Sequence, residues 1–347
     1  MTNPTNTAAY LVSEKAHPLE VREAPYPTPG PNEFVIQAHA VAINPADFIL
    51  QDQTIPFPLP SPYILGHDVA GTVLASAHPA YPAGTRVLGL STTFDTQDAS
   101  SAAFQQYVKL APPMTTRLPD AIPFEAAATL PLGVATASAG LFEAAHLGLR
   151  YPGAAAGNDR EKEVVLVWGA ASSVGAYAVQ LARGAGYDVF GVASAANGGY
   201  VRDVLGAAAV FDYREEGVVG EILEALEGRR FAGAYDAVSQ GGAVEACLEV
   251  AGRVGEGGKR FVSSVGFLPE GVKVPEGVQT NRIWGSMSRH SPVGKAVFED
   301  FLPGALEDGR FVPAPKAEVV GKGLENVQKA IDILRKGVSA KKLVVSL

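Results

Sequence analysis

Short apolar or alternating runs, separated by turns rich in proline and glycine, fill the first part of the chain. Runs of this length with a period of two residues predict β-strands. We expect such strands at residues 34–41, 69–74, 86–90 and 106–110. The first part of the chain is therefore predicted to form a β-rich, barrel-like domain, which a helix at residues 123–132 follows.

From residue 163 onward the pattern changes, because strand-like apolar runs now alternate with amphipathic helical stretches. The strands are expected at residues 164–168, 189–193, 209–211, 235–238, 260–265 and 282–284. The helices between them are expected near residues 174–183, 200–205, 218–226 and 243–250. Wholly apolar strands that alternate with helices predict a parallel sheet covered on both faces, which is a doubly wound α/β domain.

The end of the chain returns to β structure. After residue 290 one more amphipathic helix is expected at 324–334, followed by a strand at 342–345. This order indicates that the last residues complete the first domain and that the doubly wound domain is an insertion. We expect a β-barrel substrate domain formed by residues 1–124 and 290–347, and a cofactor domain formed by residues 125–289, with a polar loop at 150–163.

Composition narrows the class of protein. The 347 residues are 47% hydrophobic, without an apolar run long enough to cross a membrane or a leader-like apolar core at the polar N-terminus. The formal net charge of −8 argues against nucleic-acid and membrane-surface partners, which need a basic face. The single cysteine, Cys247, can form neither an internal disulfide nor a thiolate zinc cluster, and we interpret it as a buried helix residue. A cytoplasmic enzyme fits best.

The strongest chemical signal is the turn after the strand at 164–168, which reads Gly169-Ala-Ala-Ser-Ser-Val-Gly175 and leads directly into a helix. Small residues let the backbone approach a diphosphate, and the N–H groups of a helix N-terminus attract its charge. Ala170 and Ser172 stand where two glycines of the G-x-G-x-x-G fingerprint would be, so the motif alone is weak. An ordinary strand-to-helix turn is the alternative, which the neighbouring βαβ units disfavour.

The end of the second strand, at residues 192–197, bears on the choice of cofactor. An NAD site normally carries a carboxylate there, which holds the ribose 2′-hydroxyl. We find none in this segment, while Ser194 and Asn197 can donate hydrogen bonds to a 2′-phosphate. Tyr213 follows the third strand and could flank this phosphate or the adenine, and Arg202 is the nearest cation. The sequence therefore favours NADPH.

Five segments together resemble a known family: residues 42–47 (AINPAD), 65–71 (LGHDVAG), 130–133 (LPLG), 169–175 (GAASSVG) and 339–345 (SAKKLVV). They resemble the medium-chain dehydrogenase/reductase superfamily, in its zinc-independent quinone and enoyl reductase branch. The similarity covers nearly the whole chain and extends to fungal toxin-cluster proteins, which include the trans-acting enoyl reductases of polyketide synthases. It implies a Rossmann domain inserted into a split co-chaperonin-like β-barrel.

The resemblance also implies residue roles. Asn44 and Thr136 would line the nicotinamide, the loop and the following strand ends would hold the phosphates and adenosine, and later strand ends would face the cofactor. The implied cofactor-binding residues are Asn44, Thr136, Ala171, Ser172, Ser173, Val174, Ser194, Asn197, Tyr213, Ser239, Val265 and Gly266.

The chain departs from the wider superfamily at the positions of the zinc ligands. Its alcohol dehydrogenases hold a catalytic zinc with cysteines and a histidine, whereas only His67 matches here, and residues 44–47 and Leu132 provide no thiolate. We therefore expect no metal. His67 is either a site residue that donates a proton or hydrogen bond, or a partly buried histidine with a backbone partner.

The sequence does not identify the group that protonates the product of hydride transfer. Some enoyl reductases of the family carry a lysine or tyrosine five residues after the asparagine of the Asn-Pro motif, but Ile49 stands there and cannot donate a proton. Asp47, His67, the Tyr63 hydroxyl or water could take this role. Without zinc, a substrate carbonyl needs another electrophile, which is a nicotinamide ribose hydroxyl, Asn44 or a backbone N–H. The candidate catalytic residues are thus Asn44, Asp47 and His67.

These observations predict an NADPH-dependent reductase that transfers hydride to an enone, an enoyl thioester or a quinone. A zinc-free alcohol or ketone reductase and a catalytically decayed NADPH-binding partner protein are the alternatives. A polyketide synthase carrier protein could present the substrate. The sequence leaves the substrate and the oligomeric state open, and a homodimer would use the sheet edge at residues 282–284.

Overall fold

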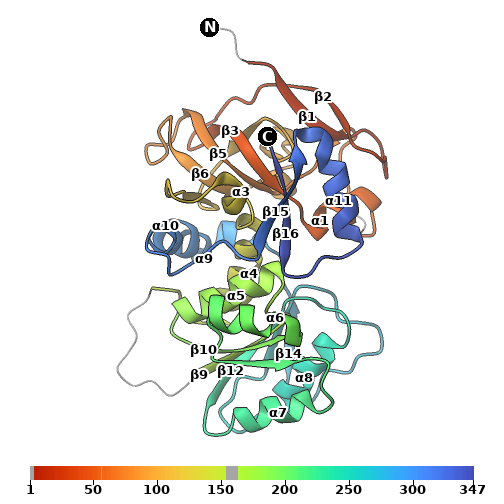
Figure 1. Ribbon diagram of the computed structural model, residues 1–347, viewed down its shortest axis with the longest axis vertical. Helices are drawn as coiled ribbons and strands as arrows, with labels where there is room; N and C mark the ends of the chain where they lie inside the picture. Colours follow the sequence, from red (N-terminus) through yellow and green to blue (C-terminus); the bar gives the residue numbers. More distant parts are fainter. Residues whose placement is uncertain (1–3, 56, 154–162) are drawn as a thin grey trace. The chain divides into compact units, whose positions relative to one another are not determined.

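The computed structural model describes residues 4–55, 57–153 and 163–347, so most of the expected loop at 150–163 lies outside the described residues. The chain divides into two compact units (Figure 1). Unit 1 comprises Met1–Leu132 and Phe298–Leu347, and unit 2 comprises Gly133–Val297. The two junctions between the units, after Leu132 and after Val297, lie later in the chain than the expected residues 124 and 289. Unit 2 is inserted in the sequence of unit 1, as expected.

Unit 1 contains a three-stranded sheet of order β2-β1-β4 and a seven-stranded sheet in which β7 pairs with β3 beside the path β15-β16-β3-β5-β6-β8. The strands are β1 (Asn6–Leu11), β2 (Glu20–Ala24), β3 (Phe34–Ala42), β4 (Tyr63–Ile64), β5 (Asp68–Ser76), β6 (Arg86–Leu90), β7 (Tyr107–Leu110), β8 (Thr115–Arg117), β15 (Lys316–Lys322) and β16 (Lys341–Ser346). All four strands expected in this region are present.

The last strand of the chain completes the larger sheet of unit 1. Strand β16 lies between β15, with which it runs parallel, and β3, with which it is antiparallel. Leu343 and Val345 of β16 pack into one hydrophobic core with Phe34, Ile36 and Val41 of β3. The expectation that the C-terminal residues return to the first domain is therefore confirmed.

The helices of unit 1 are short. They are α1 (Pro45–Asp52), α2 (Thr93–Thr96), α3 (Phe124–Ala127), α10 (Leu302–Glu307) and α11 (Val327–Arg335), with 3₁₀ turns η1 (Ala99–Ser101) and η5 (Leu324–Asn326). The π-helical segment η4 (Lys295–Phe301) and helix α4 (Pro131–Phe142) each span a junction between the units.

Unit 2 is built on a six-stranded parallel sheet with the order β11-β10-β9-β12-β13-β14. This is the 3-2-1-4-5-6 order of a doubly wound dinucleotide-binding domain. Its strands are β9 (Glu163–Trp168), β10 (Asp188–Ala193), β11 (Ala209–Asp212), β12 (Arg230–Asp236), β13 (Phe261–Ser264) and β14 (Gln279–Arg282). The expected Rossmann fold is thus confirmed.

Helices cover both faces of this sheet, with α5 and α6 on one face and α7 and α8 on the other (Figure 1). The helical segments are α5 (Ser173–Gly184), α6 (Ala195–Gly199), the π-helical η2 (Tyr200–Val204), α7 (Val218–Ala225), α8 (Ala243–Arg253), the 3₁₀ turn η3 (Met287–His290) and α9 (Pro292–Gly294). Cys247 is fully buried in α8, as predicted, in a core that includes Val164 and Leu166 of β9.

Three elements differ from the sequence-based expectation. Strand β12 begins at Arg230 instead of 235 and contains a bulge between Phe231 and Gly233, so a glycine lies inside the strand. The edge strand β14 lies at Gln279–Arg282, and its polar residues gave no apolar signal. The expected helix at 123–132 is two helices, α3 and α4, and the second begins at Pro131, where the proline ring fits a first helical turn.

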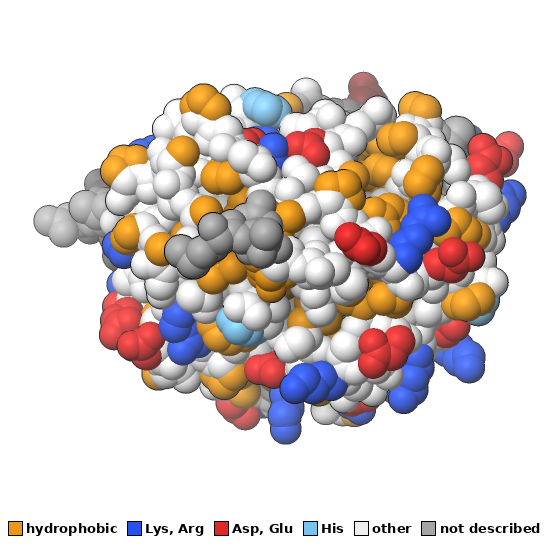
Figure 2. Space-filling view, turned by 90° about the horizontal axis from the view of Figure 1, so that it is seen from above, with side chains coloured by type: hydrophobic (Ala, Val, Ile, Leu, Met, Phe, Trp, Pro, Cys, Tyr) orange, Lys and Arg blue, Asp and Glu red, His pale blue; other side chains and the backbone are white. Residues whose placement is uncertain are grey.

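Two surface properties bear on possible partners. None of the helices in the described residues has the length and apolarity that a bilayer span requires. On the face that Figure 2 views, acidic and basic side chains are intermixed, so this face carries no continuous basic surface.

Candidate functional site

The loop between β9 and α5 depends on two glycines. Gly169 has a φ of +76°, and a Cβ there would lie 2.6 Å from Val238 Cγ1. A Cβ on Gly175 would lie only 2.2 Å from the carbonyl oxygen of Gly169. Gly175 therefore lets the first turn of α5 pack directly against the end of β9, which is the role of the last fingerprint glycine.

This packing leaves backbone donors at the start of the twelve-residue helix α5. Ser172 is the N-cap, and its Oγ accepts the N–H of Gly175 at 3.0 Å. The N–H groups of Ala171, Ser173 and Val174 have no hydrogen-bond partner among the described residues. Ser173 Oγ is also buried and unpartnered in this part of the chain. Orphaned donors at a helix N-terminus form an anion site.

A carboxylate that the sequence analysis did not consider lies beside the end of β10. Asp212 ends the neighbouring strand β11, opposite Ala193, and its Oδ2 accepts the N–H of Ala195 at 2.8 Å. The backbone N–H of Arg214, and then that of Ala195, lower the pKa of Asp212, so the group is ionised at neutral pH. Residues 192–197 themselves carry no carboxylate, and Asp212 is contributed by the neighbouring strand.

The other residues expected near the adenosine lie at the same two strand ends. Ser194 is buried and its carbonyl accepts the N–H of Asn197 at 2.8 Å. The Tyr213 side chain is 45% exposed, and the Arg214 guanidinium lies 5.4 Å from its ring centre. The corner therefore presents the Arg214 cation as well as the Asp212 carboxylate, and sequence reasoning overlooked both.

A buried carboxylate joins the ends of β12 and β13. Asp236 is fully buried; its Oδ1 accepts the N–H groups of Val238 and Ser239, and its Oδ2 accepts the hydroxyls of Ser239 and Ser264, all at 2.8–3.1 Å. Ser239 Oγ accepts the N–H of Gly266 at 2.7 Å. The structure thus brings Ser239 and Gly266 together as expected. The Ser239 hydroxyl, however, forms its hydrogen bonds with Asp236 and Gly266 of the protein.

Removing this carboxylate should destabilise unit 2. Asp236→Ala leaves buried donors without an acceptor, and we expect it to lower the free energy of unfolding by about 3 kcal/mol. Asp236→Asn retains one acceptor oxygen and faces hydroxyls that can rotate to accept, so it should cost less. Equilibrium urea unfolding of both variants checks this. Equal stability of the alanine and asparagine variants would contradict the assigned network.

Two more expected residues lie in the same unit. The carbonyl of Thr136, in α4, accepts a hydrogen bond from the Tyr235 hydroxyl at 2.9 Å, so Thr136 lies close to β12. The N–H of Val265 donates to the carbonyl of Asp236 at 3.1 Å, directly after β13. Both therefore lie near carboxyl ends of the central strands, where doubly wound sheets bind ligands.

In unit 1, the sequence-predicted residues Asp47 and His67 form a buried pair. Asn44 is the N-cap of α1 and donates its N–H to Asp47 Oδ2 at 2.7 Å. The other oxygen, Asp47 Oδ1, lies 3.0 Å from His67 Nδ1. An ionised carboxylate only accepts, so this contact places the hydrogen on Nδ1 and leaves Nε2 to exchange a proton. The partner of His67 is thus a side chain and not the backbone.

The surroundings of His67 favour its charged form. Burial lowers the pKa of His67, but the hydrogen bond to Asp47 and the negative charges of Asp47 and Asp68 outweigh burial, although Lys342 opposes them. The net result is a pKa above the ordinary value. The pair is therefore suited to hold a proton near neutral pH.

A second buried ion pair adjoins this one. Asp68 Oδ2 lies 3.2 Å from Lys342 Nζ and accepts from Asn44 Nδ2 at 2.8 Å, and Asp68 Oδ1 accepts the N–H of Leu132 at 2.6 Å. Burial raises the pKa of Asp68, against the opposing effects of Lys342, Asn44 and the Leu132 N–H. Neither Asp68 nor Lys342 received a role from the sequence, although a lysine beside the apolar run 343–345 could have signalled one.

The remaining side-chain candidate for the proton donor, Tyr63, is less suited to this role. The Tyr63 hydroxyl contacts Thr93 Oγ1 at 3.2 Å, and burial raises the pKa of Tyr63. Among the described residues no three His, Cys, Asp or Glu side chains form a group that could hold a metal ion. Zinc independence itself stays a prediction from the residues.

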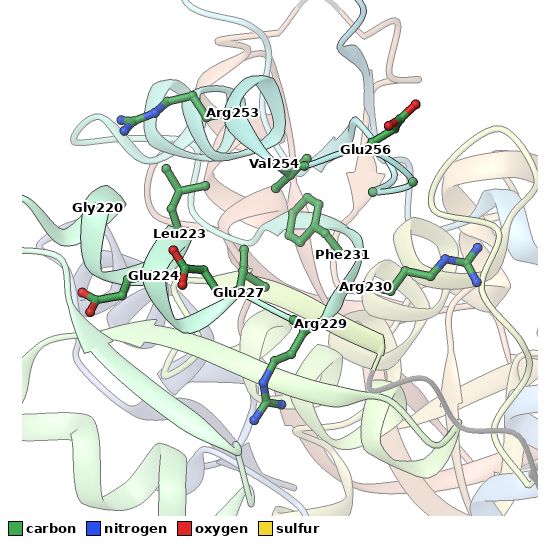
Figure 3. Close-up of a pocket in the computed structure, with 15 residues that line it drawn as sticks. Gly220, Leu223, Glu224, Glu227, Arg229, Arg230, Phe231, Arg253, Val254 and Glu256 are labelled. Atoms are coloured by element: carbon green, nitrogen blue, oxygen red, sulfur yellow. The ribbon is translucent and has the colours of Figure 1, made fainter.

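A large surface groove of unit 2 lies elsewhere. It has a volume of about 1130 Å³ and lies where β12 begins, with Phe231 and Val254 at its centre and charged side chains at its rim (Figure 3). Its arginines are paired, for example Arg229 with Asp188 at 2.7 Å. Because the loop at Gly169 follows the opposite, carboxyl end of the strands, this groove is not the dinucleotide site.

Comparison with known proteins assigns the chain to a family. Residues 30–120 match the family model described as alcohol dehydrogenase GroES-like domain, and residues 173–288 match the one described as zinc-binding dehydrogenase. The chain is 43% identical to the dehydrogenase pigH of Monascus ruber, over 99% of this chain and 100% of that protein. The chain belongs to the medium-chain dehydrogenase/reductase family. It is also 35% identical to the trans-enoyl reductase himH of Aspergillus japonicus, over 100% and 99% of the two chains.

Solved structures agree with this fold. A quinone oxidoreductase of Pseudomonas syringae pv. tomato DC3000 superposes with a TM-score of 0.73 at 22% identity, over 99% of this chain and 100% of that chain. The mycobacterial protein Rv1454c, solved in complex with NADPH, superposes with a TM-score of 0.72 at 21% identity and the same coverage. The family and the fold together make the chain an oxidoreductase of the nicotinamide-dependent type.

Proposed function

We propose that this member of the medium-chain dehydrogenase/reductase family is an NADPH-dependent, zinc-independent reductase that adds hydride to an activated carbon–carbon double bond. Its substrate is an enone, an enoyl thioester or a quinone. The observation that carries the proposal is the set of unpartnered donors at the start of α5, formed by the N–H groups of Ala171, Ser173 and Val174 and the buried Ser173 hydroxyl. These groups fit a diphosphate, which accepts hydrogen bonds and carries negative charge.

The residues present fit the rest of a dinucleotide as well. Gly175 lets α5 pack against the end of β9, which keeps the unpartnered donors of the loop together. Ser194, Asn197 and Arg214 offer donors for the adenosine end, and Ser239, Val265 and Gly266 form the strand ends that would meet the other end. When bound, NADPH supplies the hydride.

Unit 1 supplies the proton in this proposal. His67, charged and held through Nδ1 by Asp47, donates the Nε2 proton to the enolate that hydride addition creates. The remaining N–H of the Asn44 amide is the donor proposed for the substrate carbonyl. Positioned acids and hydrogen-bond donors of this kind lower the barrier to enolate formation without a metal.

The named relatives favour a double bond over a saturated ketone as the acceptor. The Aspergillus japonicus protein is named a trans-enoyl reductase, and the Pseudomonas syringae neighbour is a quinone oxidoreductase. We propose that a carrier protein presents an enoyl thioester to this enzyme, which free thioesters would then mimic poorly.

A substrate panel tests the reaction. Purified protein is expected to oxidise NADPH with at least one quinone, enone or enoyl thioester, free or carrier-bound, and not with the matching saturated ketone. Incubation with EDTA should leave the rate unchanged, because the proposed acid is His67 and no zinc is involved. Preference for the saturated ketone, or complete loss of activity with EDTA, would contradict the proposal.

The preference for NADPH is tested separately, because the Asp212 carboxylate opposes a 2′-phosphate and Arg214 attracts it. Calorimetry should show tighter binding of NADPH than of NADH, and Asp212→Asn should widen the difference by about three- to tenfold. The exposed Glu215→Gln is the matched control and should change neither affinity. Equal affinity of the native protein for both dinucleotides would show that the cofactor choice is wrong.

A further inference from the structure

A buried lysine enters the site of unit 1 from the last strand. Lys342 lies in β16 beside three buried apolar residues and is only 4% exposed. Removing an ammonium group from water costs several kcal/mol unless a counter-charge and hydrogen bonds compensate it. Lys342 Nζ has both, because it lies 3.2 Å from Asp68 Oδ2 and donates to Asn44 Oδ1.

The charges of this ion pair determine how the Asn44 amide is oriented. The oxygen and nitrogen of an asparagine side chain are usually hard to tell apart. Lysine offers only donors and an ionised aspartate only acceptors, so Oδ1 must face Lys342 and Nδ2 must face Asp68. The opposite orientation would set donor against donor and acceptor against acceptor. One N–H of Nδ2 is then left for a ligand.

The same asparagine also supports the acid pair. Its backbone N–H holds Asp47 Oδ2, and Asp47 Oδ1 holds His67. The ion pair is therefore linked to His67 through Asn44 and Asp47, and also through the chain, because Asp68 follows His67.

We propose that Lys342 and Asp68 are positioning residues of this site, a buried ion pair that fixes the donor face of the Asn44 amide and sets the charge balance around His67. The role of His67 rests on the proposed function, but the ion pair itself can be tested without any turnover. The charged groups that face His67 are Asp47 from α1, Asp68 from β5 and Lys342 from β16. The two carboxylates favour the imidazolium ion and the ammonium group disfavours it.

Removal of each charge should move the His67 titration in opposite directions. The experiment follows the His67 ring nitrogens of the full-length protein by NMR as a function of pH. Lys342→Met should raise the midpoint, and Asp68→Asn should lower it, each by on the order of half a pH unit or more. Lys341→Met is the matched control, because Lys341 is exposed, pairs with Glu318 at 2.6 Å and should leave the midpoint unchanged.

A purely structural ion pair would affect stability without moving these midpoints in opposite senses. Unchanged midpoints, or shifts of the same sign in both variants, would overturn the proposal. If Lys342→Met alone does not fold, the double variant with Asp68→Asn, which removes both charges, is compared with Asp68→Asn, and its midpoint should be the higher. A midpoint that is not higher would also overturn it.

The titration distinguishes this inference from the proposed function. Opposite shifts in a protein that reduces none of the panel substrates would support the ion pair and reject the reductase. Reduction of a panel substrate without the shifts would support the reductase and reject the ion pair. Where turnover is observed, the alkaline limb of the kcat/KM profile should follow the NMR midpoints.

Discussion

Replacing Gly175 with alanine is expected to weaken dinucleotide binding by about a hundredfold. The new Cβ would lie 2.2 Å from the oxygen and 2.9 Å from the carbon of the Gly169 carbonyl group, and 3.0 Å from Ala170 Cα. These are backbone atoms that cannot rotate away, so α5 and the end of β9 must separate. Overpacking of this kind costs about 1–3 kcal/mol of stability.

The expected loss of affinity is larger than the loss of stability. Separation of α5 from β9 moves the N–H groups of Ala171, Ser173 and Val174 away from a shared target, and a displacement of about 1 Å can cost about a hundredfold. Calorimetry with NADPH and urea unfolding measure the two effects.

The matched control is Gly220→Ala in α7, where an added Cβ meets no atom within 4 Å. That substitution should preserve binding and raise stability by about 0.5–1 kcal/mol, since alanine favours a helix interior. Wild-type affinity in Gly175→Ala would show that the cradle at α5 does not hold the cofactor.

The second large effect is expected at His67. Because its folded-state pKa is raised, His67 carries its proton at and below the unfolded value of about 6.5 and loses it as the pH rises through the folded value. Activity should therefore fall on the alkaline side. The stability that the charged ring contributes is likewise fully present below about pH 6.5 and lost as the pH rises through the folded pKa.

His67→Gln should lower kcat by about 10²–10⁴-fold and remove this alkaline limb, with NADPH affinity unchanged. Asp47→Asn removes the charge that favours the imidazolium ion, so the limb should move to lower pH. The exposed His290→Gln serves as control and should change neither property. A full rate in His67→Gln would assign the proton to water or to another group.

The doubly wound fold could be predicted because its central strands are apolar throughout and buried on both faces. The limits of that approach show at β14, whose residues Gln279–Arg282 pair on one side only and have no need to be apolar. They show again at β12, which was expected only from residue 235, although the strand continues back to Arg230 through a bulge in which Gly233 has a φ of +117°.

The candidate site likewise contains residues that could be predicted from the sequence and contacts that could not. Residues that come within a few positions of a strand end, such as Ser173 and Gly266, could be located from the sequence, because the carboxyl ends of parallel strands meet. Asp47 and His67 were both candidates, but their pairing through Nδ1 was not predicted. The contact between Asn44 and Lys342 could not be predicted, since the two residues lie near opposite ends of the chain and only folding brings them together. Asp212 was missed for a related reason, because hydrogen bonding across neighbouring strands places it beside Ala195.

The position of β16 between β15 and β3 has a consequence for biosynthesis. Residues 1–132 leave the ribosome long before Lys342 is translated, and the whole of Gly133–Val297 is made in between. Unit 2 can thus fold as it emerges. Asn44 and Asp68, in contrast, can contact Lys342 only after the final strand has been translated. A nascent chain halted before Lys341 would therefore carry a complete dinucleotide fold beside an unfinished acid centre.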